Sequence, residues 1–279
     1  SFEFKVLADP IATGDYVELP AQPSLAIVPG MPEVWKAVLP TLVPVGASFR
    51  LCLKAEDIWG NPSGRISETV RFDTERPVAG LPETVTFQPG ERAKVIDGLS
   101  IAGECDLVIR VLSADGDVLT TSNLCRISDA YAYGQYWSDL HGQSEETVGT
   151  NAARDYFAFA RDLGFLDIAG HQGNDFQITD AFWAELNGLT AEFDEPGRFV
   201  CVPGFEWSGN TNLGGDHNVW YRQEGRPIFR SSRVLIDDTD GPATDAHTLP
   251  ELFQKLQGED ASVVAHCGGR YADVALAHD

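Results

Sequence analysis

The chain has 279 residues, 43% of them apolar, which is enough to build a hydrophobic core in two modest domains or in one large barrel. It carries 20 Lys and Arg residues against 42 Asp and Glu residues, a formal net charge of −22. A surface this negative repels nucleic-acid phosphate and anionic lipid, so we expect neither as a partner. No apolar run approaches the roughly 18 residues that a membrane helix requires.

Residues 1–130 contain short apolar segments separated by Gly, Pro and Asp. In residues 48–57 the large apolar side chains alternate, which is the period of a half-buried strand. Asp115-Gly116 lies between two such segments and predicts a hairpin turn. Many short strands without a convincing helix favour an antiparallel β-sandwich of the immunoglobulin type over residues 1–130.

The periodicity changes after residue 130, where segments of helical and of strand pattern alternate. Such an alternation predicts βα units and a largely parallel sheet or barrel. The predicted helices cover residues 150–164, 178–193 and 248–257, and the predicted strands cover residues 136–141, 165–169, 198–206, 217–221 and 262–266.

Histidines and one glutamate recur at the edges of these strands. The residues are His141, His171, Glu206, His217 and His266. In α/β barrels the carboxyl ends of the strands converge, and imidazole with carboxylate suits zinc, manganese or iron. A single histidine at a strand end is more often a hydrogen-bonded structural residue, but the repetition favours a metal site. His217 opens its strand, so it can join only if that strand runs antiparallel or the preceding loop folds over the site.

Three further residues have two readings each. Asp139 precedes His141 by two positions and can orient its imidazole, or it is a buried hydrogen-bonded aspartate. Arg270 can clamp a substrate oxyanion, although most surface arginines do not. Asn174 can meet substrate or metal, or cap the following helix.

The chain has five cysteines, widely spaced and without a CxxC pair. This spacing predicts neither a zinc ribbon nor a disulfide framework, and it favours free thiols in a reducing cytoplasm. Secretion after removal of a leader remains an alternative.

The motifs DLHGQS, GHQGND, PGFEWSGNT, GGDHNVWY and AHCGG resemble those of the PHP (polymerase and histidinol phosphatase) superfamily of metal-dependent phosphoesterases, over about residues 131–279. They are similar to a bacterial branch that carries a β-rich domain before the catalytic one. The resemblance implies a distorted (β/α)7 barrel that binds two or three divalent ions (Mn, Zn or Fe). It also implies that the histidines at 141, 171, 217 and 266 are metal ligands and that Glu206 is a bridging carboxylate.

The chain departs from that family in two ways. Gln143 stands where the family's His-x-His motif has its second histidine, and a neutral carboxamide oxygen is a poorer ligand. The late Asp-x-His pair is absent, and about five strands follow residue 130, too few to close a barrel. We therefore expect a partial (β/α)7-type barrel over residues 131–279, with a missing C-terminal portion or a partner fragment.

The leading functional hypothesis is metal-assisted hydrolysis of a phosphate ester in a small, anionic substrate, with Glu206, Asp139 and Arg270 as catalytic candidates. A second hypothesis keeps the metal but cleaves amides, lactones or other esters. A third is an inert binding or interaction protein with a degenerate site, which the glutamine at position 143 supports.

Overall fold

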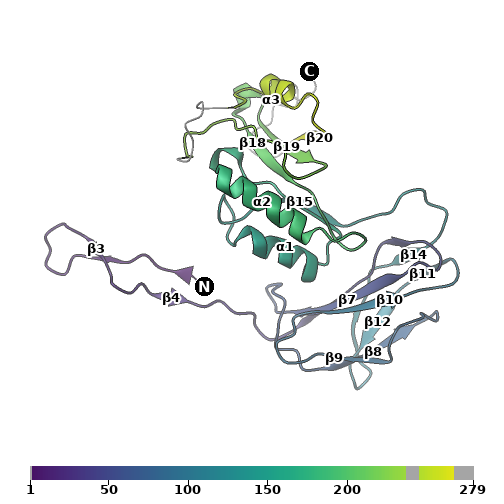
Figure 1. Ribbon diagram of the computed structural model, residues 1–279. Coiled ribbons are helices and arrows are strands. Elements are labelled where there is room, and N and C mark those ends of the chain that lie inside the picture. The colour runs from purple at the N-terminus through teal and green to yellow at the C-terminus, as the bar shows by residue number, and fades with distance from the viewer. Residues whose placement is uncertain (1, 237–244, 267–279) are drawn as a thin grey trace. The chain divides into compact units, whose positions relative to one another are not determined.

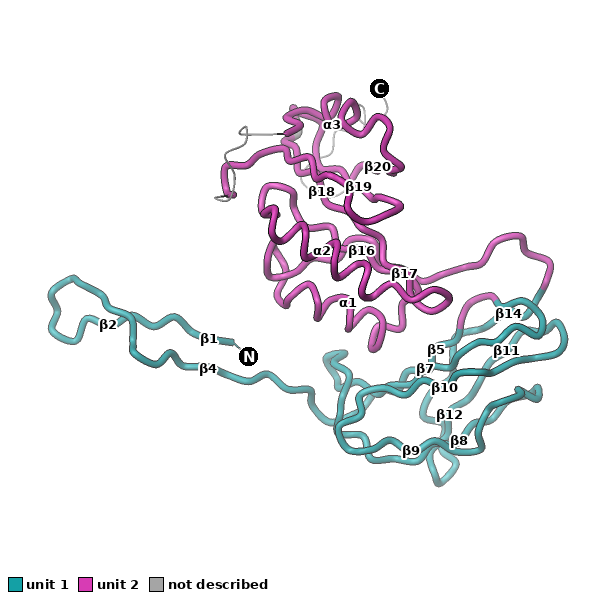
Figure 2. The backbone as a smooth tube through the Cα atoms, in the orientation of Figure 1, with its two compact units in different colours: residues 1–39, 43–128 teal, residues 40–42, 129–279 magenta. Residues whose placement is uncertain are grey.

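The computed structural model describes residues 2–236 and 245–266. Its internal contacts divide the chain into two compact units, shown in different colours in Figure 2. Unit 1 comprises Ser1–Leu39 and Val43–Ser128, and unit 2 comprises Pro40–Leu42 and Asp129–Asp279. Each unit contains its own cluster of buried apolar side chains.

The first part of the chain consists of short strands (Figure 1). They are β1 (Phe2–Glu3), β2 (Leu7–Ala8), β3 (Val17–Glu18), β4 (Ser24–Leu25), β5 (Val34–Val38), β6 (Leu42–Val43), β7 (Phe49–Glu56), β8 (Thr69–Thr74), β9 (Thr84–Thr86), β10 (Lys94–Leu99), β11 (Cys105–Leu107), β12 (Ile109–Leu112), β13 (Val118–Thr121) and β14 (Cys125–Ile127). They form sheets in the orders β1-β4, β2-β3, β10-β7-β5, β11-β14-β6 and β13-β12-β8-β9. The registered pairs are antiparallel.

Strand β7 shows how the sequence pattern produces this unit. The alternation at residues 48–57 predicts a half-buried strand, and the structure confirms it: Leu51 and Leu53 are fully buried between β10 and β5. The turn predicted at Asp115-Gly116 is also confirmed, because β12 and β13 pair there and Gly116 has a φ of 98°, which favours glycine. Strands β10 and β14 were not predicted, because Asp97-Gly98 interrupts the apolar residues of β10 and β14 has only three residues.

Unit 2 contains the described helices together with six strands. The elements are β15 (Ser138–Gly142), α1 (Ala153–Asp162), β16 (Ile168–His171), η1 (Asp175–Gln177), α2 (Asp180–Phe193), β17 (Val200–Cys201), β18 (Gly204–Ser208), η2 (Thr211–Leu213), β19 (Asp216–Tyr221), α3 (Leu249–Lys255) and β20 (Ala261–Ala265). The three predicted helices are present in shorter form. The strand predicted at 198–206 is two strands, because Pro203 lies between β17 and β18 and lacks the backbone N–H of a ladder residue.

The prediction of a partial (β/α)7-type barrel over residues 131–279 is wrong. Within the described residues, unit 2 has two separate three-stranded sheets, and only β15-β16-β17 is parallel. Strands β18, β19 and β20 pair antiparallel. The physical reason is the length of the β18–β19 connection: residues 209–215 are too few for the crossover that a parallel pair requires, so the chain turns back as a hairpin.

The core of unit 2 lies between its helices and one face of its strands. Helices α1 and α2 lie side by side in Figure 1, and they contribute Phe157, Phe182 and Leu186 to this core. Strands β18 and β19 contribute Phe205, Trp207 and other apolar residues from alternate positions, so the intervening residues of these strands face the opposite side. None of the described helices combines the length and apolar character needed to cross a membrane.

Candidate metal centre

Three of the expected ligands meet where the two sheets of unit 2 approach each other. His141 lies near the end of β15, Glu206 in the middle of β18, and His266 directly after β20. One ligand atom from each residue lies within 4.8 Å of the others. The Nε2 atom of His141 is 3.8 Å from Oε2 of Glu206, and Nδ1 of His266 is 3.0 Å from Oε1 of Glu206. The structure therefore brings together residues that are 125 positions apart in the sequence, from 141 to 266.

Strand parity explains which side chains reach this cluster. Phe205 and Trp207 face the core and are fully buried, so Glu206 between them must face the other side. Glu206 is paired in register with Asn218 of β19, and the Oδ1 atom of Asn218 lies 2.8 Å from Nδ1 of His141. Asn218 was not predicted as a site residue. The signal was present in HNVWY, where Val219 and Tyr221 are apolar and the residue at 218 alternates with them.

The Glu206 carboxylate is buried, with 4% of its side chain exposed. Its Oε2 atom accepts hydrogen bonds from Nδ2 of Asn174 at 2.9 Å and from Nε2 of Gln143 at 3.4 Å. Among the residues that the structure describes, no Lys or Arg side chain contacts it. Besides these hydrogen bonds, a proton on a neighbouring imidazole or a bound cation would stabilise such a buried carboxylate.

The tautomer of His141 favours a cation. The Oδ1 atom of Asn218 can only accept, so Nδ1 of His141 carries a hydrogen, and in the neutral ring Nε2 then has a lone pair on the side of Glu206. Two lone-pair atoms 3.8 Å apart match two ligands that each lie roughly 2.0–2.2 Å from one ion. Two imidazoles and one carboxylate are a ligand set suited to zinc, manganese or iron. The residues present therefore fit a divalent metal.

The structure places Gln143 beside this cluster but not as an oxygen ligand. Its Oε1 atom accepts a hydrogen bond from Thr147 Oγ1 at 2.6 Å, and its Nε2 atom donates to the carbonyl oxygen of Gln172 at 2.7 Å. The carboxamide thus turns its N–H group toward Glu206. In this arrangement Gln143 orients the carboxylate, and its oxygen is occupied elsewhere.

His171 and His217 do not join the cluster. Nε2 of His171 lies 2.7 Å from Oγ of Ser144, and its Nδ1 accepts from the backbone N–H of Gly173 at 3.1 Å. Burial lowers the pKa of His171 to about 4, so this ring is neutral and both of its nitrogens are occupied. His217 faces the core side of β19, with Nδ1 bonded to the carbonyl of Gly215, and burial lowers its pKa as well.

Asp139 and Arg270 are the remaining catalytic candidates from the sequence. Oδ1 of Asp139 accepts from the backbone N–H of His141 at 3.0 Å, which holds the turn of chain that carries this imidazole. Arg270 lies outside the described residues. Asn174, for which the sequence left two readings, bridges Glu206 and Ser208 through its Nδ2 atom, at 2.9 Å and 3.0 Å.

Comparison with known proteins gives limited information. No family model matches the chain. An uncharacterized protein of Chlamydia pneumoniae is 24% identical over 229 residues, which are 79% of this chain and 36% of that protein. The chain therefore spans about a third of the length of this curated relative.

Solved structures with partial similarity are small β-rich domains. The D00-D0 domain of intimin is 9% identical with a TM-score of 0.28, covering 37% of this chain and 50% of that chain. The C-terminal domain of ZirS is 16% identical with a TM-score of 0.28, covering 42% of this chain and 86% of that chain. The PKD domain of an M14-like peptidase from Thermoplasmatales archaeon SCGC AB-540-F20 is 12% identical with a TM-score of 0.23, covering 37% of this chain and 100% of that chain. TM-scores this low carry no argument about fold or function.

Proposed function

We propose that the chain is a metal-dependent hydrolase in which His141, Glu206 and His266 hold a divalent ion, and that its substrates are phosphate esters. The observation that carries this proposal is the convergence of three ligand atoms within 4.8 Å, on a buried carboxylate that contacts no described Lys or Arg. The lone pair that His141 Nε2 turns toward this carboxylate supports it further.

The chain's own residues would prepare this site before any substrate arrives. Asn218 holds the Nδ1 hydrogen of His141, so that Nε2 stays directed at Glu206. Asn174 and Gln143 direct amide N–H groups at Oε2 of Glu206 and limit its rotation. Without metal, the His266 imidazole donates its Nδ1 hydrogen to Oε1 of Glu206, and ligation of an ion through Nδ1 would require the tautomer with its hydrogen on Nε2.

A divalent ion bound by this ligand set supplies a water molecule of lowered pKa and a positive charge next to the oxygen that develops charge. Glu206 would be the general-base candidate beside this ion, and the contact of Nδ1 of His266 with Oε1 of Glu206 at 3.0 Å would position that carboxylate. The positive charge matters for this protein because a chain of net charge −22 otherwise repels an anionic ester.

Phosphate esters are chosen over other esters on two grounds. The similarity of DLHGQS, PGFEWSGNT and AHCGG to motifs of PHP phosphoesterases supports phosphate esters, although the described residues do not form the barrel that this similarity implied. The buried carboxylate and its neutral surroundings also make the metal the local source of charge that a phosphoryl group requires. Hydrolysis of amides, lactones or other esters, and an inert module, are alternative outcomes of the test.

The test begins with metal content. The protein is equilibrated separately with Mn, Zn and Fe, dialysed and analysed for bound metal, for the wild type, Glu206→Gln, His266→Ala and the control His247→Ala, whose imidazole lies outside the ligand set. We expect about one ion or more per chain in the wild type and the control, and a loss of binding of at least about tenfold in the two site variants.

The loaded protein is then assayed on nitrophenyl phosphate mono- and diesters and, in parallel, on a nitrophenyl carboxylic ester and a nitroanilide. Turnover of the phosphate substrates that disappears in Glu206→Gln supports the proposal. Turnover confined to the carboxylic ester or the anilide would replace phosphate esters by the second class of substrate. A wild type that retains no metal contradicts the proposed function.

A further inference from the structure

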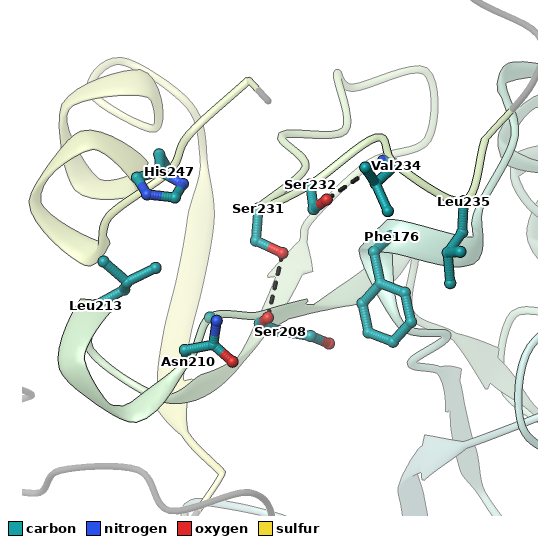
Figure 3. Close-up of a pocket in the computed structure, with 10 residues that line it drawn as sticks. Phe176, Ser208, Asn210, Leu213, Ser231, Ser232, Val234, Leu235 and His247 are labelled. Atoms are coloured by element: carbon teal, nitrogen blue, oxygen red, sulfur yellow. Dashed lines mark hydrogen bonds between the residues drawn. The ribbon is translucent and has the colours of Figure 1, made fainter. Parts of the chain in front are cut away.

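A cavity of about 450 Å³ lies at the end of β18 in unit 2 (Figure 3). Its volume falls within the roughly 300–1,000 Å³ that is typical of small-molecule sites. Phe176, Ser208 and Ser231 lie on its walls, together with Gly209, Asn210, Leu213, Ser232, Val234, Leu235 and His247. The residues come from η1, from β18 and the loop after it, and from two segments later in the chain.

One side chain, Asn174, contacts both the candidate metal centre and the cavity wall. Ser208 follows Glu206 by two residues on β18, so both side chains leave the strand on the same face. The Nδ2 atom of Asn174 donates to both of them, to Oε2 of Glu206 at 2.9 Å and to Oγ of Ser208 at 3.0 Å. One carboxamide therefore contacts both a candidate metal ligand and a residue of the cavity wall, so the two features are adjacent on β18.

The described part of the cavity wall is largely uncharged. Among the described lining residues there is no Lys, Arg, Asp or Glu, and His247 is the one titratable side chain. The charged groups just behind it are already paired: Arg233 forms an ion pair with Asp245 at 3.0 Å, and the buried Asp175 carboxylate accepts from the backbone N–H groups of Ser208 and Ser231. A charged group of a ligand would find no oppositely charged Lys, Arg, Asp or Glu among these lining residues, which favours an uncharged ligand group at this wall.

The lining combines an apolar side with a polar side. Figure 3 shows the ring of Phe176 near Leu235, whereas Asn210 and Ser231 lie across from them. Ser231 donates its hydroxyl hydrogen to the carbonyl of Ser208 at 3.2 Å, which leaves its oxygen lone pairs available as acceptors. The Asn210 carboxamide makes no hydrogen bond within the described parts of the chain, so it offers both a donor and an acceptor.

We propose that this cavity binds an uncharged ring that carries hydroxyl groups on one side and an apolar face on the other, as pyranosides and nucleosides do. This inference rests on the proposed function, because it makes the ring the alcohol portion of the ester that is cleaved. The aromatic and aliphatic walls pack against the apolar face, and the serine and asparagine groups bind the hydroxyls. The substrate is then a phosphate monoester whose only charge is at the metal centre.

The test measures binding of uncharged probes to metal-free protein by ligand-observed NMR titration. One arm uses a methyl glucopyranoside and the other uses adenosine, so that the two sources of such a ring are distinguished. The variants are Asn210→Trp, which fills the cavity from an exposed position, and the control Phe159→Trp on the outer face of α1. We expect at least one probe to bind the wild type and the control, and to bind Asn210→Trp about tenfold or more weakly.

A fourth protein separates this inference from the proposed function. His266→Ala removes a metal ligand and lies outside the cavity lining, so we expect it to lose metal and to keep its affinity for the probe. If the wild type retains metal in the metal analysis but its metal-free form binds neither probe, the inference fails and the proposed function stands. The same conclusion follows if Asn210→Trp binds the probe as well as the wild type does. If the wild type binds the probe but no metal, the proposed function fails and the cavity assignment stands.

Discussion

Two buried titratable groups, His171 and Asp175, should oppose each other in the pH dependence of the stability of unit 2. Burial lowers the pKa of His171 from 6.5 to about 4. Burial raises the pKa of Asp175 from 3.8 to about 6, against the backbone N–H groups of Ser231 and Ser208, which lower it. Each group therefore titrates at a different pH in the folded and unfolded states, and this difference makes stability depend on pH.

The signs follow from which state holds more protons. Folding lowers the pKa of His171. Its contribution to the free energy of unfolding is therefore fully present above pH 6.5, and it is lost as the pH falls through about 4. The pKa of Asp175 is raised on folding, so its contribution is fully present below pH 3.8 and is lost as the pH rises through about 6. At about 1.4 kcal/mol for each pH unit between the two pKa values of a group, each contribution is about 3 kcal/mol. In the wild type the two nearly cancel between about pH 4 and about pH 6.

Single variants expose each contribution. His171→Gln and Asp175→Asn replace the titratable group by a neutral amide of similar polarity. The free energy of unfolding of His171→Gln, relative to that of the wild type, should rise by about 3 kcal/mol as the pH falls from about 7 to about 4. That of Asp175→Asn should fall by about 3 kcal/mol over nearly the same range. Any loss of packing adds a constant offset and leaves these slopes unchanged.

The assay is urea unfolding at a series of pH values, followed by the helical circular dichroism signal. The described helices α1, α2 and α3 all belong to unit 2, so this signal reports the unit that contains both residues. The double variant should return to a pH dependence close to that of the wild type, because it lacks both opposing groups. Parallel curves for the wild type and the two single variants would refute the reasoning.

Further predictions concern two glycines and one helix cap. Gly188→Ala in α2 should raise the free energy of unfolding by about 0.5–1 kcal/mol, because a Cβ atom there meets nothing within 4 Å and alanine favours a helix. Gly204→Ala should lower it by several times as much and reduce metal binding, because the new Cβ atom would collide with the backbone carbonyl of Val219 beside the cluster. Urea unfolding and metal analysis compare the two glycine variants, and equal changes in their free energy of unfolding would contradict the prediction. Thr248→Ala should lower the free energy of unfolding by about 1 kcal/mol, because it removes the side-chain oxygen that accepts from the N–H of Glu251 and caps α3. An unchanged urea midpoint would argue against this capping role.

The local elements of this protein follow from short stretches of sequence. The alternation in residues 48–57 specifies β7, and the helical spacing in residues 178–193 specifies α2, because in each case the buried face is encoded within the element itself. The sequence also predicted Glu206 and His266 at strand ends; His266 directly follows β20, whereas Glu206 lies in the middle of β18. These features depend on neighbours within a few residues, and a sequence pattern records such neighbours directly.

The arrangement of the sheets could not be derived from the same patterns. The apolar runs of β18 and β20 fit a parallel barrel as well as they fit an antiparallel sheet, since both bury one face of a strand. The short β18–β19 connection decides in favour of the hairpin. Once that direction is set, strand parity turns Asn218 toward His141 and turns His217 toward the core.

The sequence by itself determined the helices, several strands and the candidate ligands. Only the tertiary structure brings ligand atoms of His141, Glu206 and His266 within 4.8 Å of one another, while His171 is held by Ser144 and the backbone of Gly173. The physical reason is that a ligand cluster depends on distances and tautomers set between strands far apart in the chain. Those distances follow from packing and strand direction, which no local pattern of residues contains.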